Sequence, residues 1–87
     1  MDRECEVRDL EMAERHIVEG EQRITTQVAL LEGLREKRRD VTAAERLLDL
    51  LEDTLAQWHS HRMLIRERIA TIDASNELAC EVSDARA

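Results

Sequence analysis

The chain has 87 residues, enough for one small domain, and its composition narrows the class of fold. It contains no Pro, no Phe, no Tyr, one Trp and two Gly, whereas 38% of its residues are charged and 43% are hydrophobic. Sheets are built from β-branched and aromatic residues between turn-forming residues, so this composition favours long helices or coiled coils. A net charge of -7 disfavours a protein that holds nucleic acid through many phosphate contacts.

The apolar runs of the sequence are only a few residues long, too short for a transmembrane helix or for the core of a signal peptide. We therefore predict no membrane partner and a cytoplasmic location. Cys5 and Cys80 lie near opposite ends of the chain without CxxC spacing. In a reducing compartment they are expected to be free thiols.

A seven-residue repeat predicts a first helix over about residues 4–38. Two rows of this repeat form one continuous seam, the second row three positions after the first: Leu10, Ile17, Ile24 and Leu31, then Ala13, Gly20, Gln27 and Leu34. The segment begins with acidic residues and ends with basic ones, which is the charge order that a helix dipole favours.

A second helix is predicted over about residues 42–75. Thr42 and Glu45 have the spacing of a capping box, which would begin this helix. Its seam combines two rows that again repeat every seven positions: Ala44, Leu51, Trp58, Ile65 and Ile72, with Leu48, Leu55, Arg62 and Ile69. Asp73, Ser75 and Asn76 compete for backbone hydrogen bonds, so the helix is expected to fray or end there, leaving residues 76–87 as a tail.

Only residues 39–41 separate the two predicted helices, so the chain is expected to fold back as an antiparallel hairpin, a single domain over residues 1–87. One unbroken helix is the competing interpretation, because no Gly or Pro marks the turn. The capping box and the basic end of the first helix favour the hairpin.

The second helix carries apolar residues over a wider arc than one neighbouring helix can cover. The fold class predicted is therefore all-α, an antiparallel two-helix hairpin that dimerises into a four-helix bundle. Six residues are expected to form the interaction and dimer seam: Leu47, Leu50, Leu51, Leu55, Trp58 and Ile65.

His16, His59 and Arg62 are the candidates for a binding site, because folding back at Asp40 brings His16 level with residues 59–63. His59 and His61 are two positions apart and point away from each other on a helix, so they cannot chelate one metal ion together. Arg62 occupies an otherwise apolar row. It is expected to form an inter-helix or inter-subunit ion pair that sets the register, with an acidic residue at the level of Glu14 to Glu21.

Four basic residues gather at the predicted turn: Arg35, Lys37, Arg38 and Arg39. They would compensate the dipole of the first helix or form a tip that docks an acidic partner. No aromatic residue accompanies them for base stacking, which further disfavours nucleic acid as a partner. No nucleophile lies beside a base and an oxyanion site, so we expect no enzymatic activity and no cofactor.

The segment Ala13-Glu14-Arg15-His16-Ile17-x-Glu19-Gly20-Glu21-x-Arg23-Ile24-x-x-Gln27, with Thr42-Ala43-x-x-x-Leu47-Leu48 and His61-Arg62, resembles a group of short uncharacterised helical-hairpin proteins of alphaproteobacteria, particularly rhizobial relatives. The resemblance covers about residues 10–66. It departs at the turn, where the group carries Asp-Gly-His-Asp and this chain carries Lys37 to Val41. The resemblance implies a helical hairpin and no substrate.

The function predicted from the sequence is a non-enzymatic protein–protein interaction or structural module, a self-associating homodimer that also binds an unidentified protein. The alternative is a small ligand or metal sensor at the level of His16, His59 and Arg62.

Overall fold

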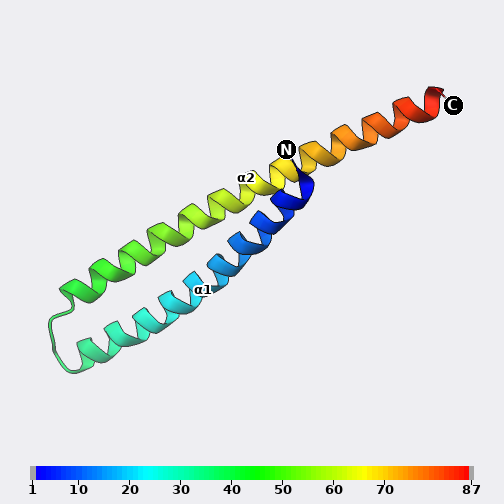
Figure 1. Cartoon of the computed structure of the whole chain (residues 1–87). Helices are drawn as coiled ribbons and strands as arrows, with labels where there is room; N and C mark the ends of the chain where they lie inside the picture. Colours follow the sequence, from blue (N-terminus) through cyan, green and yellow to red (C-terminus); the bar gives the residue numbers. More distant parts are fainter. Residues whose placement is uncertain (1, 87) are drawn as a thin grey trace.

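The computed structural model describes the backbone of residues 2–86 and the side chains of residues 2–76. Within these residues it contains two α-helices and no strand: α1 spans Arg3–Glu36 and α2 spans Thr42–Arg86. The helices run antiparallel along each other from a short turn, and α2 continues past the start of α1 (Figure 1). The result is a rod of 76 × 15 × 14 Å. The all-helical class with two helices is confirmed.

The first turn of α1 is capped by its own sequence. The carboxylate of Asp2, at the N-cap, accepts a hydrogen bond of 3.0 Å from the amide of Glu4. Glu4 and Glu6 lie in this first turn, where negative charge interacts favourably with the helix dipole.

α1 ends in a Schellman motif without glycine. The amide of Arg39 donates to the carbonyl of Leu34 at 2.9 Å, and the amide of Arg38 donates to the carbonyl of Arg35 at 3.0 Å. Arg38 has a φ of 56°, the left-handed conformation that this motif requires and that glycine usually supplies. The helix therefore stops at Glu36, slightly earlier than expected, and residues 37–41 form the connection.

α2 begins at Thr42, as predicted, but the predicted capping box is wrong. The carboxylate of Asp40 accepts hydrogen bonds from the Thr42 amide at 3.0 Å and from the Thr42 hydroxyl at 2.7 Å. The amide of Glu45 instead donates to the Val41 carbonyl at 2.8 Å. An aspartate two positions upstream thus replaces the threonine as the cap, because its longer reach satisfies both donors at once.

The predicted end of the second helix near residue 75 is also wrong, because the backbone of α2 is helical to Arg86. Asp73, Ser75 and Asn76 lower helix propensity only slightly each. They are interleaved with Ala74 and followed by Glu77 and Leu78, which are good helix formers. The part of α2 beyond Asp73 has no α1 residue beside it, since Arg3 at the start of α1 already contacts Asp73.

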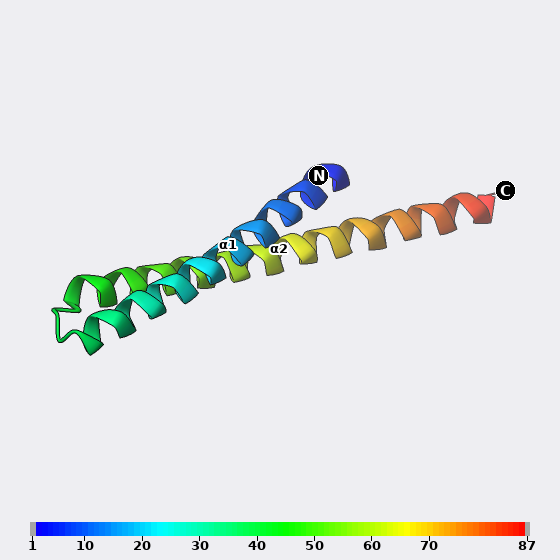
Figure 2. The ribbon, with the colours of Figure 1, turned by 90° about the horizontal axis from the view of Figure 1, so that it is seen from below.

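The core is a thin seam between the helices, which cross over each other in the view of Figure 2. Among the described side chains, four hydrophobic residues are buried: Ala13, Ile17, Leu31 and Ile65. All four occupy seam positions predicted from the seven-residue repeat. A seam this narrow leaves most of the surface of both helices in water.

Two seam residues allow the helices to approach closely at defined points. A Cβ atom on Gly20 would lie 3.3 Å from Cδ1 of Leu55, so the absence of a side chain lets Leu55 pack against the backbone of α1. Gln27 is buried, and its side-chain nitrogen donates a hydrogen bond of 3.0 Å to the carbonyl of Ala44. These contacts hold α1 against residues 44–55 of α2.

Candidate functional site

The two flanks of the helix pair differ in charge. With Leu10 and Leu48 taken as position a of the heptad, the e positions of α1 and α2 lie side by side on one flank and the g positions on the other. Two ion pairs join e positions: Arg35 to Glu45 at 3.2 Å and Glu14 to Arg66 at 3.3 Å. We call this side, defined by these four residues, the ionic flank.

The opposite side of α2 carries no charged residue over its middle. Six consecutive g and c positions form this stripe, which we call the uncharged stripe: Leu47, Leu50, Thr54, Gln57, His61 and Leu64. Its absence of charge is unusual in a chain of which 38% is charged. These six residues can be read from the sequence, but they can be assigned to one stripe only when the packing shows which heptad positions face α1.

Large apolar side chains gather on the same side of the molecule. Seven are 46–63% exposed among the described residues. Five of them occupy g or c positions: Met12 and Leu30 on α1, with Leu47, Leu50 and Leu64 on α2. The other two, Val18 and Met63, occupy b positions on the far side. The exposed large apolar side chains therefore gather on the g and c side of the molecule, toward the two ends of the uncharged stripe.

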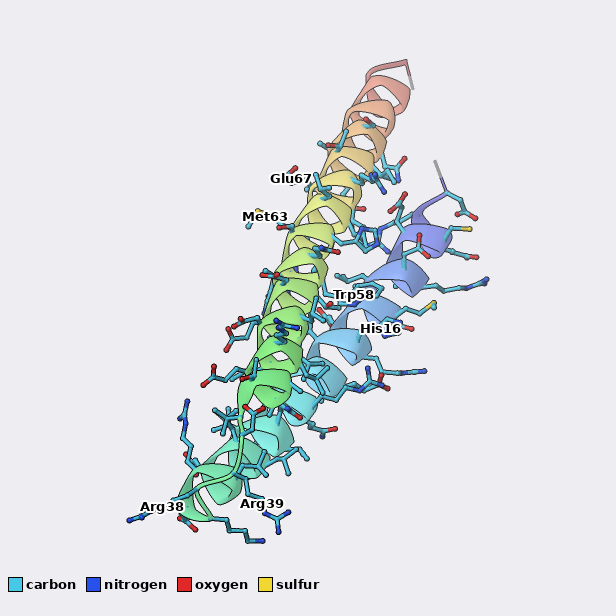
Figure 3. The ribbon with its side chains drawn as sticks, turned by 90° about the vertical axis from the view of Figure 1, so that its left-hand side faces the viewer. His16, Arg38, Arg39, Trp58, Met63 and Glu67 are labelled. Carbon is cyan, nitrogen blue, oxygen red and sulfur yellow. The ribbon has the colours of Figure 1, made fainter. Side chains whose placement is uncertain are left out.

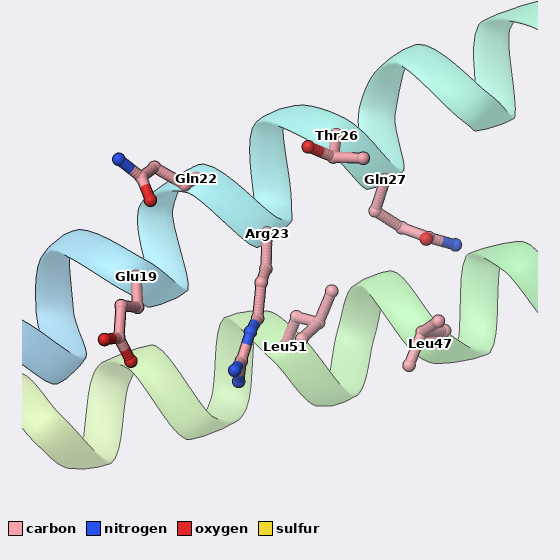
Figure 4. A pocket seen from close by; sticks show the side chains of 7 residues that line it. All are labelled: Glu19, Gln22, Arg23, Thr26, Gln27, Leu47 and Leu51. Atoms are coloured by element: carbon pink, nitrogen blue, oxygen red, sulfur yellow. The ribbon is translucent and has the colours of Figure 1, made fainter.

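This side of the molecule is also hollowed. A groove of about 410 Å³ lies between the helices, with Leu47 and Leu51 of α2 on one wall and polar side chains of α1, from Glu19 to Gln27, on the other (Figure 4). A second hollow of about 470 Å³ is lined by Thr54, Gln57, Trp58 and His61. Both hollows border the uncharged stripe.

His16 lies against Trp58 across the seam (Figure 3). Their ring centroids are 4.2 Å apart with an interplanar angle of 17°, a stacked arrangement. His61 meets Trp58 edge-on, with centroids 5.7 Å apart. His16 therefore lies near the predicted level of residues 59–63, but its partner is Trp58, a contact that the seven-residue pattern does not predict because Trp58 occupies a seam position.

His59 and Arg62 contact each other within α2. Nη2 of Arg62 donates to Nδ1 of His59 at 3.2 Å, and since arginine is only a donor, this ring nitrogen is the acceptor. The inter-helix ion pair predicted for Arg62 is not formed: within residues 2–76, the arginine that pairs with Glu14 is Arg66. The inter-subunit form of that ion pair stays a prediction.

The three residues proposed as a sensor site therefore engage different neighbours. His16 stacks on Trp58, whereas His59 and Arg62 bind each other. Among the residues that the structure describes, no cluster of three or more His, Cys, Asp or Glu side chains is placed to hold a metal ion.

The predicted dimer seam divides into two groups. Leu47 and Leu50 are exposed, as a surface for a partner requires. Leu51, Leu55 and Trp58 are half-buried, and Ile65 is fully buried against α1. Ile65 therefore belongs to the core of one chain, and its assignment to a dimer contact is corrected.

The basic tip of the rod consists of Lys37, Arg38 and Arg39 in the connection and Arg35 at the end of α1 (Figure 3 labels Arg38 and Arg39). Arg35 is held by Glu45, whereas the three connection residues are exposed and form no ion pair with any side chain of residues 2–76. Their charge is therefore available to an acidic partner.

At the opposite end of the paired region, α1 begins with an acidic segment, and ion pairs join this segment to α2. Nε of Arg3 donates to Asp73 at 2.7 Å, and this contact lowers the pKa of the Asp73 carboxyl group. Glu6 is buried at a seam position with Nη1 of Arg68 3.8 Å from its Oε2 atom, which has no hydrogen bond. Residues 2–14 contain six acidic and two basic residues.

Cys5 is a free, exposed thiol at this end. Its sulfur lies 3.5 Å from a carboxylate oxygen of Asp2, which raises the pKa of the thiol by stabilising its protonated form. The side chain of Cys80 lies outside the described residues.

Neither helix has, within the described residues, an apolar stretch that could cross a bilayer. No protein-family model and no curated protein matches the sequence significantly, and no solved structure matches the fold significantly. The resemblance to the rhizobial-type helical-hairpin proteins therefore stays a prediction.

Proposed function

We propose that this protein is a non-enzymatic helical hairpin that self-associates into a homodimer and acts as a protein–protein interaction module. The observation that carries the proposal is the clustering of five exposed large apolar residues on the g and c positions, away from the ionic flank. Exposed large apolar side chains that gather on one side of a small chain are typical of a surface that a partner covers. A second copy of the hairpin would cover it and complete a four-helix bundle.

The test compares two exposed apolar residues with nearly the same exposure on different faces. Leu50, 62% exposed, lies on the proposed face, and Met63, 63% exposed, lies on the far side. Light scattering of the unchanged protein should return twice the chain mass of 10.1 kDa. Leu50→Arg should return a single chain mass with its helicity retained, whereas Met63→Arg should stay dimeric.

A monomeric mass for the unchanged protein at micromolar concentration would contradict the proposal. An equal loss of association in both variants would instead show that the dimer does not form through the face that contains Leu50. The two substitutions add the same charge at equally exposed sites, so only their position differs.

A further inference from the structure

We propose that the second copy binds antiparallel, with the uncharged stripe of one α2 packed on the same stripe of the other and the two-fold axis between Leu55 and Ala56. This inference rests on the proposed self-association and adds the face, the orientation and the register of the dimer.

The spacing of residues along the uncharged stripe supports this register. Its residues alternate by three and four positions, as the contact line of a coiled coil does. A two-fold axis between residues 55 and 56 places Leu47 opposite Leu64 of the second copy, Leu50 opposite His61, and Thr54 opposite Gln57. The apolar residues then meet at both ends of the contact, and two residues that can hydrogen-bond to each other meet at its centre.

The charge distribution selects the orientation. Residues 35–46 contain five basic and three acidic residues, a net charge of +2, whereas residues 2–14 have a net charge of -4. The antiparallel register brings the basic turn of one copy level with Asp73 of the other, which is the level of Arg3 and the acidic segment. A parallel dimer would place basic turn against basic turn, an arrangement that like-charge repulsion disfavours.

Two of the ion pairs within each chain lie away from the stripe, whereas Arg68, at the g position after Leu64, pairs with Glu6 at the end of the stripe. Arg35–Glu45 and Glu14–Arg66 lie on the ionic flank, so a second copy on the uncharged stripe buries neither of them. Glu19 and Arg23 line the α1 wall of the groove (Figure 4), and Asp53 and Arg68 flank the stripe on α2. The six residues of the contact line therefore bring no charged side chain of their own to be desolvated.

The experiment uses disulfide formation between copies, which requires Cβ atoms about 4 Å apart. In a chain with Cys5→Ser and Cys80→Ser, the variants Leu47→Cys and Leu64→Cys are oxidised separately and as a refolded equimolar mixture. We expect a covalent dimer in the mixture and at least tenfold less in either variant alone. Met63→Cys, on the far side, is the control and should give none.

Covalent dimers formed by each variant alone would overturn the antiparallel orientation in favour of a parallel one. A dimeric mass by light scattering with no cross-link in the mixture would overturn the face and leave self-association standing. If Leu47→Cys itself becomes monomeric, the pair Leu50→Cys and His61→Cys repeats the test with both outer leucines in place. A monomeric mass for the parent chain with both serines would overturn the proposed function as well.

Discussion

Arg38 is the residue at which the chain reverses, and it does so in a conformation that costs an ordinary L-residue free energy. A φ of 56° brings the Cβ atom close to the following carbonyl oxygen. The Schellman hydrogen bonds of Arg38 and Arg39 hold this conformation in place. The strain is thus stored at the basic tip, where the charge of Arg38 is also exposed.

Arg38→Gly should raise the free energy of unfolding by about 1 kcal/mol, because glycine adopts the left-handed conformation without the Cβ contact. Urea unfolding followed by the helical circular dichroism signal measures this change. Arg39→Gly is the matched control and should be neutral or destabilising, since Arg39 has no positive φ. Equal effects of the two substitutions would contradict the role assigned to Arg38.

Asp40 holds the start of α2, and its hydrogen bonds make that role depend on pH. The bonds from the Thr42 amide and hydroxyl lower the pKa of the Asp40 carboxyl group in the folded chain. A carboxyl group with a lowered folded pKa stabilises the fold above its unfolded pKa. This contribution is lost as the pH falls through the lowered value, below about pH 4.

Asp40→Ala should therefore lower the midpoint of thermal unfolding at pH 7, and the difference from the unchanged protein should shrink on acidification below about pH 4. Thr42→Ala should have a smaller effect at pH 7, because it removes only the hydroxyl bond of the two that Asp40 accepts. A constant difference between Asp40→Ala and the unchanged protein down to pH 2 would show that the carboxylate does not cap α2.

Within α2, Arg62 interrupts a row whose other members, Leu48, Leu55 and Ile69, face α1. Its guanidinium group binds His59 of the same helix and is half-buried. It therefore contributes no ion pair between the helices, while it displaces an apolar side chain from the seam.

Arg62→Leu should raise the free energy of unfolding by up to about 1 kcal/mol, because a leucine at this position buries additional apolar surface. Arg66→Leu, one turn away, removes the exposed ion pair with Glu14 and should change stability little. Thermal unfolding of both variants at one protein concentration measures the difference. If Arg62→Leu instead destabilises the protein, the inter-subunit ion pair expected from the sequence accounts for it.

The seven-residue repeat predicted the two helices and their buried hydrophobic residues correctly. The residues at the helix ends predicted those ends less well. Ala13, Ile17, Leu31 and Ile65 are buried where the seven-residue rows place them, because burial of an apolar row is decided by many residues together. The ends depend on single hydrogen bonds: Asp40 rather than Thr42 caps α2, and Arg38 takes the place of a glycine. The site was predicted only in part, since the uncharged stripe and the His16–Trp58 stack depend on which positions face α1.

At the scale of the whole molecule, the rod is much longer than a compact domain of its size. Its radius of gyration is 20.9 Å, whereas a compact chain of this length would have about 12 Å. Shape in solution therefore reports directly on how two copies are arranged.

Small-angle scattering should distinguish the arrangements by maximum dimension. A parallel, in-register dimer would keep a length near the 76 Å of one chain. The antiparallel dimer centred between Leu55 and Ala56 should be about 20 Å longer, because α2 extends further from that point toward its end than toward the turn, at 1.5 Å per residue. A dimer with an unchanged maximum dimension would contradict the antiparallel register.

The rod is only 15 × 14 Å in cross-section, so the interior is one side chain deep. In a larger compact domain, residues that keep the fold and residues that meet a partner can occupy different depths. Here Trp58 belongs to both sets, because it stacks on His16 of α1 and lines a hollow beside the uncharged stripe. A substitution of Trp58 that changes the proposed dimer contact should therefore also change stability, which would couple the evolution of recognition to that of the fold.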